Sequence, residues 1–310
     1  MIALLIFSII AGAHYAPELY KKNYINSYEV GLEGPQLSYT FKNDDDNDNP
    51  EFDKFAYEPN LNTMTSFSLG TKYVDIGFTF EGERENSKDD IYDPTNVFDI
   101  QLLGVYKNFL WEAYYQNYQG LYILDDEELG ELSEQPRANS HSHGLHVKYF
   151  TKEGFDLKKS LGHFSIVKES NWSYVHGLFI DRSKLSSSSD SLIPLKYQSS
   201  FDQIADLNAI KSTAIGYDFG VAALKTWESL YVSGLLSVGI VGQQLEFEGI
   251  DTEGRDITNS TTNVIFDMGY QTTNKSIGVQ ARVQSYNMAV ENIDLDKART
   301  ITRVYFNYYL

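Results

Sequence analysis

Apolar residues recur at every second position along most of the chain from about Gln36 onward. Successive side chains of a β-strand point to opposite faces of the sheet, so this spacing places the apolar side chains on one face. In residues 74–81, Val, Ile, Phe and Phe alternate with Asp, Gly, Thr and Glu, and residues 263–271 and 277–284 repeat the pattern with Ile265 as an interruption. The pattern predicts strands with one apolar and one polar face.

The predicted links between strands alternate in length. Short links fall near residues 70–72, 106–108, 223–226 and 273–275, and longer polar links at 42–51, 84–95, 125–140, 183–207, 250–257 and 291–297. Bacterial outer-membrane barrels have short periplasmic turns and long external loops. We therefore expect the loops near Asp45 and Asp126 outside and the turns near Lys107 and Lys225 in the periplasm. The link at 151–161 is longer than this pattern requires.

These observations predict an all-β chain that forms an antiparallel, up-and-down transmembrane β-barrel of about twelve strands, with both ends on the periplasmic side. Ten or fourteen strands are also compatible with the pattern. The expected strands are 27–41, 52–69, 73–83, 96–106, 109–123, 141–150, 163–182, 208–222, 227–248, 258–272, 275–290 and 298–310.

The C-terminal strand is similar to the one that the barrel-assembly machinery recognises. One face carries Val304, Phe306, Tyr308 and Leu310, and the other carries Arg303, Asn307 and Tyr309. A terminal aromatic residue is usual in such strands, and Leu310 departs from that. We expect the assembly machinery and outer-membrane lipid to be partners of this chain. An ordinary edge strand of a soluble protein would leave Phe306 and Tyr308 exposed without a reason.

Trp111 and Trp227 each lie beside a predicted short link. Aromatic residues gather where a barrel wall meets the membrane interface, so we expect both in a periplasmic girdle. The alternative is that they are core aromatics of a soluble barrel.

Composition narrows the class further. A chain of 310 residues fits one barrel domain, and its 23 Tyr and 18 Phe favour strands. The net charge of -18 argues against nucleic acid as a partner. With no cysteine the chain has neither disulfides nor thiolate zinc sites. After the first dozen residues no stretch is apolar enough for a membrane-spanning helix.

The N-terminus predicts a secreted protein. Ile2 to Ile10 form an apolar run, and Ala11 to Ala13 form the small-x-small pattern of a cleavage site. We expect a signal peptide at residues 1–13 and a single barrel domain at 14–310. No Lys or Arg precedes the apolar run, and a buried N-terminal strand or helix remains the alternative.

The chain resembles an uncharacterised family of bacterial outer-membrane β-barrels known only as a domain of unknown function. The resemblance covers most of the mature chain and rests on the order of three segments: 57–60 (YEPN), 115–122 (YQNYQGLY), and 215–219 (IGYDF) followed by Trp227 and Gly234. Trp172, Ser173 and Tyr174 fit the family pattern, whereas residues 186–189 lack the Gly of its Ser-x-Gly-Ser stretch. The resemblance implies an outer-membrane barrel and no catalytic residues.

Three clusters suggest metals, and each has a simpler interpretation. The acidic run 43–49 lacks the Gly and Glu of a calcium loop, which favours a solvated loop. The acidic residues at 125–134 could share divalent cations with anionic lipopolysaccharide, although solvation explains them too. His141 and His143 share one strand face and His146 lies on the other, which disfavours a common metal. We expect no metal and no cofactor.

The signatures Gly-x-Ser-x-Gly and His-Glu-x-x-His do not occur in the sequence. A serine and a histidine from neighbouring strands could still form a hydrolytic site, so enzymatic activity stays open.

The polar faces of the predicted strands place eight charged residues in the lumen. They are Asp75, Asp99, Glu112, Asp218, Asp267, Arg282, Arg299 and Arg303. Guanidinium groups bind carboxylates through two parallel hydrogen bonds, so these residues could form an internal brace. The equal alternative is that they line a water-filled pore.

The sequence thus predicts an outer-membrane barrel from a Gram-negative-type bacterium that acts as a narrow pore, a ligand-binding barrel or a structural component. A barrel of twelve strands is wider than the eight-stranded ones filled by side chains and narrower than porins. The alternatives are an outer-membrane enzyme of the phospholipase or acyltransferase kind and a soluble secreted β-sandwich.

Overall fold

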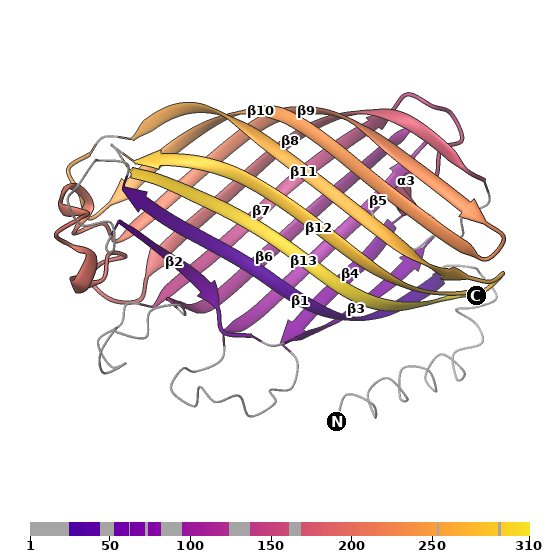
Figure 1. Ribbon diagram of the computed structural model, residues 1–310, viewed down its shortest axis with the longest axis horizontal. Helices are drawn as coiled ribbons and strands as arrows, with labels where there is room; N and C mark the ends of the chain where they lie inside the picture. Colours follow the sequence, from indigo (N-terminus) through magenta and orange to yellow (C-terminus); the bar gives the residue numbers. More distant parts are fainter. Residues whose placement is uncertain are drawn as a thin grey trace.

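The computed structural model describes residues 25–43, 53–61, 63–71, 74–81, 95–123, 137–160, 169–252, 254–290 and 293–310. They form one closed antiparallel sheet (Figure 1). Its strands are β1 (Ile25–Asn43), β2 (Lys54–Pro59), β3 (Met64–Thr71), β4 (Val74–Glu81), β5 (Asn96–Tyr106), β6 (Phe109–Tyr122), β7 (Ala138–Phe150), β8 (Asn171–Ser187), β9 (Ala209–Trp227), β10 (Leu230–Glu248), β11 (Arg255–Gln271), β12 (Lys275–Val290) and β13 (Ile293–Tyr309). The helices are α3 (Leu157–Ser160) and the 3-10 helices η3 (Leu195–Tyr197) and η4 (Asp202–Ile204).

The sheet closes because its last strand pairs with its first. The ladder between β1 and β13 runs from Ser27 opposite Tyr309 to Asn43 opposite Ile293, so both chain ends of the barrel lie at the end that holds the short turns. We call this the short-turn end and the opposite one the long-loop end. A closed sheet has no free edge. The closure confirms the predicted barrel and rules out the alternative of a β-sandwich.

One predicted strand, 52–69, is divided into β2 and β3. Along β1, β3 pairs with the half at the short-turn end and β2 with the half at the long-loop end. β2 ends at Pro59, which has no N–H to donate to a ladder. Because β2 and β3 share one place in the wall, the barrel has twelve strand positions.

Several predicted boundaries are wrong, among them the end of β8, which continues to Ser187 and not to 182. The short link expected at 223–226 lies instead at Glu228 and Ser229, because β9 continues to Trp227. The expected long link at 291–297 is only two residues, since β13 begins at Ile293 and Ile293 and Leu295 are buried inside the barrel mouth. β8 begins at Asn171, not at 163, and residues 161–168 lie outside the described ones.

Apolar side chains cover the outer wall, and polar ones line the inside apart from an apolar cluster toward each end. Leu178, Ile215 and Ile240 are each more than 60 % exposed on the outer face, while Glu112 and Asp267 are at most 3 % exposed. Soluble proteins show the reverse distribution, and this one is typical of barrels built for a membrane.

No helix among the described residues is both long and apolar enough to cross a bilayer.

All three tryptophans lie on the outer wall close to the short-turn end. Trp111 and Trp172 are within two residues of the first residue of β6 and β8, and Trp227 is the last residue of β9. Trp172 and Trp227 are both about half exposed. The expected strand start at 163 placed Trp172 in mid-wall, which is why the sequence assigned only Trp111 and Trp227 to the girdle.

Candidate functional site

The interior of the barrel is the candidate site, because charged side chains from opposite walls meet there. All eight charged residues that the sequence assigned to the lumen have buried or nearly buried side chains, and each has an oppositely charged partner within 3.1 Å. Removing charges from water is costly, so their ion pairs and hydrogen bonds must compensate.

One ion pair crosses the barrel. Arg282 on β12 donates to both carboxylate oxygens of Glu112 on β6, at 3.1 and 3.4 Å. Five strand positions separate β6 from β12 in either direction around the wall, so the two strands face each other. This contact therefore bridges the lumen.

Two arginines of β13 form similar ion pairs beside this one. Arg299 donates to Asp99 at 3.1 Å, and Gln116 donates to the same carboxylate oxygen at 2.6 Å. Arg303 donates to Glu29 at 2.9 Å, with Glu33 at 3.9 Å. These contacts connect β13 to β1 and, across the lumen, to β5.

A second set of pairs lies on the wall formed by β7, β8 and β9. The Nζ of Lys148 donates to Asp218 at 3.0 Å. His146 bonds Asp181 at 2.9 Å, and the hydroxyl of Tyr114 donates to the same carboxylate at 2.8 Å. The hydroxyl of Tyr286 reaches Asp181 from β12 at 3.2 Å.

The long link between β7 and β8 folds back into the short-turn end as a plug. Its helix α3 contacts β6, β9 and β10, which belong to different walls, and Phe155 and Leu157 join an apolar cluster with Leu110, Leu224 and others. Lys158 forms an ion pair of 2.7 Å with Asp75. In Figure 1 α3 is labelled toward the same end as the C-terminus.

Lys159 is the most enclosed charge of the plug. It is fully buried, with its Nζ 3.0 Å from Asp267, 2.9 Å from the hydroxyl of Tyr305 and 4.0 Å from the ring centre of Tyr231. Burial lowers the pKa of Lys159, and the Asp267 carboxylate acts in the opposite direction. The Tyr305 hydroxyl donates to Asp267 at 2.6 Å, so the carboxylate has two partners.

Glycine makes room for these tyrosines. A Cβ on Gly278 would lie 2.6 Å from the hydroxyl oxygens of Tyr231 and Tyr305. Position 278, which faces the lumen beside these two tyrosines, therefore has to lack a side chain.

An apolar lid closes the long-loop end. The loop between β8 and β9 buries Leu192, Ile193, Tyr197, Phe201, Ile204 and Leu207 against inward residues of the wall, and its short helices lie at the left of Figure 1. Phe55 of β2 stacks near both aromatic rings of the lid, at 4.8 Å from Tyr197 and 5.3 Å from Phe201. The Tyr57 hydroxyl donates to the carbonyl of Leu192 at 2.8 Å.

The histidines considered as a metal site are not brought together. His141 and His143 lie on the outer wall with their rings 5.7 Å apart, whereas His146 bonds Asp181 inside. Within the described ranges no three His, Asp or Glu side chains converge on one point. The acidic segments 44–49 and 125–134, the loops near Asp45 and Asp126 and the signal peptide lie outside the described residues.

Sequence reasoning missed the lysines and several carboxylates of the site. Lys148 and His146 share the inward phase of β7 with buried Phe150, a signal that was available in the alternation. Lys158 and Lys159 carry no such signal, because they lie on a link whose path through the lumen depends on the closed wall. The interruption at Ile265 has its explanation here, since Ile265 faces inward in the apolar cluster of the plug.

Comparison with known proteins gives one family. Residues 17–309 match the family described as "Domain of unknown function (DUF4421)". No curated protein matches the chain.

Solved structures similar to this chain are outer-membrane proteins. The outer membrane protease OmpT of Escherichia coli is 8 % identical with a TM-score of 0.41, and the comparison covers 92 % of this chain and 97 % of OmpT. The outer membrane protein OmpT of Vibrio cholerae gives 7 % and 0.34, with coverage of 91 % and 98 %. The toluene transporter TodX of P. putida gives 10 % and 0.29, with coverage of 92 % and 90 %.

Proposed function

Because this chain belongs to the DUF4421 family, whose description supplies no activity, we propose a function from its geometry. The protein is an outer-membrane barrel that is closed to solutes at rest, and it serves as a structural or binding component, not as a general porin.

The location is supported by the outer wall. Large apolar side chains such as Leu178, Ile215 and Leu236 are exposed on it, and lipid is the medium that such a surface requires. In this location the short-turn end faces the periplasm and the long-loop end faces outward, and β13 is the strand that the assembly machinery engages.

One observation carries the closed state: the ion pair between Arg282 and Glu112 crosses the lumen. The plug at one end and the lid at the other add two obstructions in series. An open porin lumen instead holds a continuous column of water.

A narrow gated pore is the second candidate, and the plug favours it. α3 belongs to a link and not to the wall, so it can leave the lumen without breaking a strand ladder. The ion pairs of Lys158 and Lys159 would then be the contacts that hold the gate shut.

An enzyme of the phospholipase or acyltransferase kind requires a serine within hydrogen-bond reach of a histidine. Among the described histidines, the hydrogen bonds of His146 and His176 go to Asp181 and Tyr217, and none joins a serine. This arrangement gives the enzyme alternative no support.

Planar-bilayer conductance of the refolded protein tests the proposal. We expect current steps far below those of a general porin measured in the same bilayers. Large, steady steps from the unmodified protein would overturn the closed state. Brief openings that lengthen when Lys158 and Lys159 are both replaced by Ala would instead support the gated pore.

A further inference from the structure

The outer wall changes from apolar to cationic between two successive rows of side chains on β7, β8, β9 and β10. Strand pairing aligns these rows across the four strands. The last apolar row is Leu145, Ile180, Ile215 and Gly242; the next is His143, Arg182, Thr213 and Gln244; and the one after is His141, Lys184, Lys211 and Glu246.

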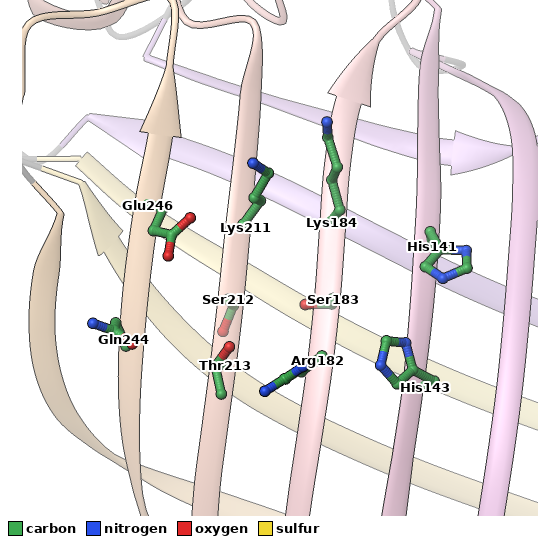
Figure 2. Close-up of a pocket in the computed structure, with 10 residues that line it drawn as sticks. All are labelled: His141, His143, Arg182, Ser183, Lys184, Lys211, Ser212, Thr213, Gln244 and Glu246. Carbon is green, nitrogen blue, oxygen red and sulfur yellow. The ribbon is translucent and has the colours of Figure 1, made fainter.

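The two polar rows line an open groove of about 430 Å³ on the outside of the barrel. Figure 2 shows their side chains on the four adjacent strands. The inward neighbours Ser142 and Leu185 are buried, which places His141, His143, Arg182 and Lys184 on the outer face.

The groove lies at the height of a membrane surface. On β8 the outward residues from Trp172 to Ile180 are aromatic or apolar apart from His176, and Arg182 follows directly. Eight residues of rise on a strand tilted by roughly 40° span about 20 Å, close to the height of a lipid-facing band. Trp172 lies at the edge of this band toward the short-turn end, so Arg182 and Lys184 lie at its edge toward the long-loop end.

The cations of the groove are only partly neutralised. Lys184 lies directly opposite Lys211, and like charges in such a pair repel. Glu248 binds both ammonium groups, at 3.3 Å from Lys184 and 2.5 Å from Lys211. Each ammonium has three N–H donors, so donors remain on both, and Arg182 has no ion-pair partner among the described residues.

A phosphate group fits this set of donors. Arginine and lysine form short, charge-assisted hydrogen bonds to phosphate oxygens, and an imidazole N–H adds a further donor. Three cations in one groove are notable in a chain with 43 acidic and 25 basic residues. Two carboxylates, Glu246 opposite Lys211 and Glu248, lie beside these three cations, so one positive charge remains for a further anion.

We propose that this groove binds the phosphate of a lipid headgroup in the leaflet at the long-loop end, which in an outer membrane is the lipopolysaccharide leaflet. The proposal rests on the proposed membrane location. The acyl chains of this lipid would lie on the apolar rows toward the short-turn end, and its phosphate would lie against Arg182, Lys184 and Lys211.

Binding of lipopolysaccharide to the refolded full chain in nonionic detergent tests the proposal. The probes are phosphorylated lipopolysaccharide, the same lipid after enzymatic dephosphorylation, and inorganic phosphate, with Kd measured by microscale thermophoresis. The double variant Arg182→Gln/Lys211→Gln removes two cations of the groove. The matched control Lys225→Gln/Lys275→Gln removes two outward lysines at the short-turn end.

We expect the groove variant to bind phosphorylated lipid about tenfold more weakly, the control to bind it unchanged, and dephosphorylated lipid to bind weakly to all three proteins. Equal Kd values for the groove variant and the unmodified protein would overturn the proposal. Inorganic phosphate that binds as tightly as the lipid would also overturn it, because the groove would then be a site for free anions.

Two controls separate this result from the proposed location. Heat-modifiable migration shows whether each protein is a folded barrel, and solubility without detergent shows whether that barrel needs a membrane. A folded barrel that stays soluble without detergent would refute the membrane location itself. A barrel that needs detergent but does not distinguish the phosphorylated lipid would refute the headgroup site alone.

Discussion

Lys159 of α3 and Asp267 of β11 form an ion pair of 3.0 Å in which neither side chain is exposed. This pair ties the plug to the barrel wall. A buried charge that loses its partner is strongly destabilising, whereas replacement of both partners by apolar groups is often neutral. The plug should therefore respond differently to single and double replacements.

The variant Lys159→Met should release the plug. Asp267 would keep only Tyr305 as a partner, and we expect a loss of about 3–5 kcal/mol in the free energy of unfolding. The link should also become sensitive to proteases, because proteolysis reports local opening. Urea unfolding in micelles and limited proteolysis measure the two effects.

Lys152→Met is the matched control, because Lys152 lies on the same link with an exposed side chain. Its effect should stay within about 0.5 kcal/mol, as for most surface replacements. The double variant Lys159→Met/Asp267→Leu should recover most of the lost stability. If Lys159→Met and Lys152→Met behave alike, the ion pair does not hold the plug.

Gly278→Ala should disturb the same region from β12, the strand that pairs with β11. Its Cβ would lie 2.6 Å from the hydroxyl oxygens of Tyr231 and Tyr305, so at least one ring has to shift. Overpacking of this kind costs about 1–3 kcal/mol. The control is Gly34→Ala, where the nearest atom is the Thr302 carbonyl oxygen at 3.9 Å. The midpoint temperature of the heat-modifiable gel shift should fall for Gly278→Ala only.

The chain has no cysteine, so single cysteines report its orientation directly. Asp190→Cys lies on the lid loop and Lys107→Cys in the two-residue turn between β5 and β6. An impermeant maleimide on intact cells should label position 190 and leave position 107 unlabelled until the outer membrane is opened. Labelling at 107 alone would invert the proposed orientation.

The sequence predicted the wall better than the interior, for a physical reason. Alternation of side chains is local, so the inward direction of Arg282 and Glu112 could be inferred from their own strands. Their contact could not, because it depends on the closed order in which β6 and β12 face each other.

The plug and the lid were missed for a related reason. Polar links are usually surface loops. The segment at 183–207 is predicted as a long polar link of that kind, and the one at 151–161 only as a link longer than the barrel pattern requires. Leu192, Phe201 and Leu207 are apolar residues within a predicted long link, and they were the available signal that this link is buried. The divided strand at Pro59 had a signal too, since proline interrupts a ladder.

The pair Arg282–Glu112 separates a brace from a water-filled pore lining. In a brace, Arg282→Met leaves Glu112 buried without its cation, and we expect a loss of about 3–5 kcal/mol in the free energy of unfolding. The double variant Arg282→Met/Glu112→Leu should regain most of it. In a wetted pore lining both charges are already hydrated, so the single replacement would change stability little and would alter ion selectivity instead.

Conductance completes this test, because obstructions in series act independently. The lid around Phe201 and the plug around Lys159 remain in the Arg282→Met/Glu112→Leu variant, so its current should stay as low as that of the unmodified barrel. A stable double variant with low current fits a brace within a lumen closed at both ends. If Arg282→Met alone changes the ion selectivity of a large existing current and leaves urea unfolding unchanged, the charges line an open pore and the brace is wrong.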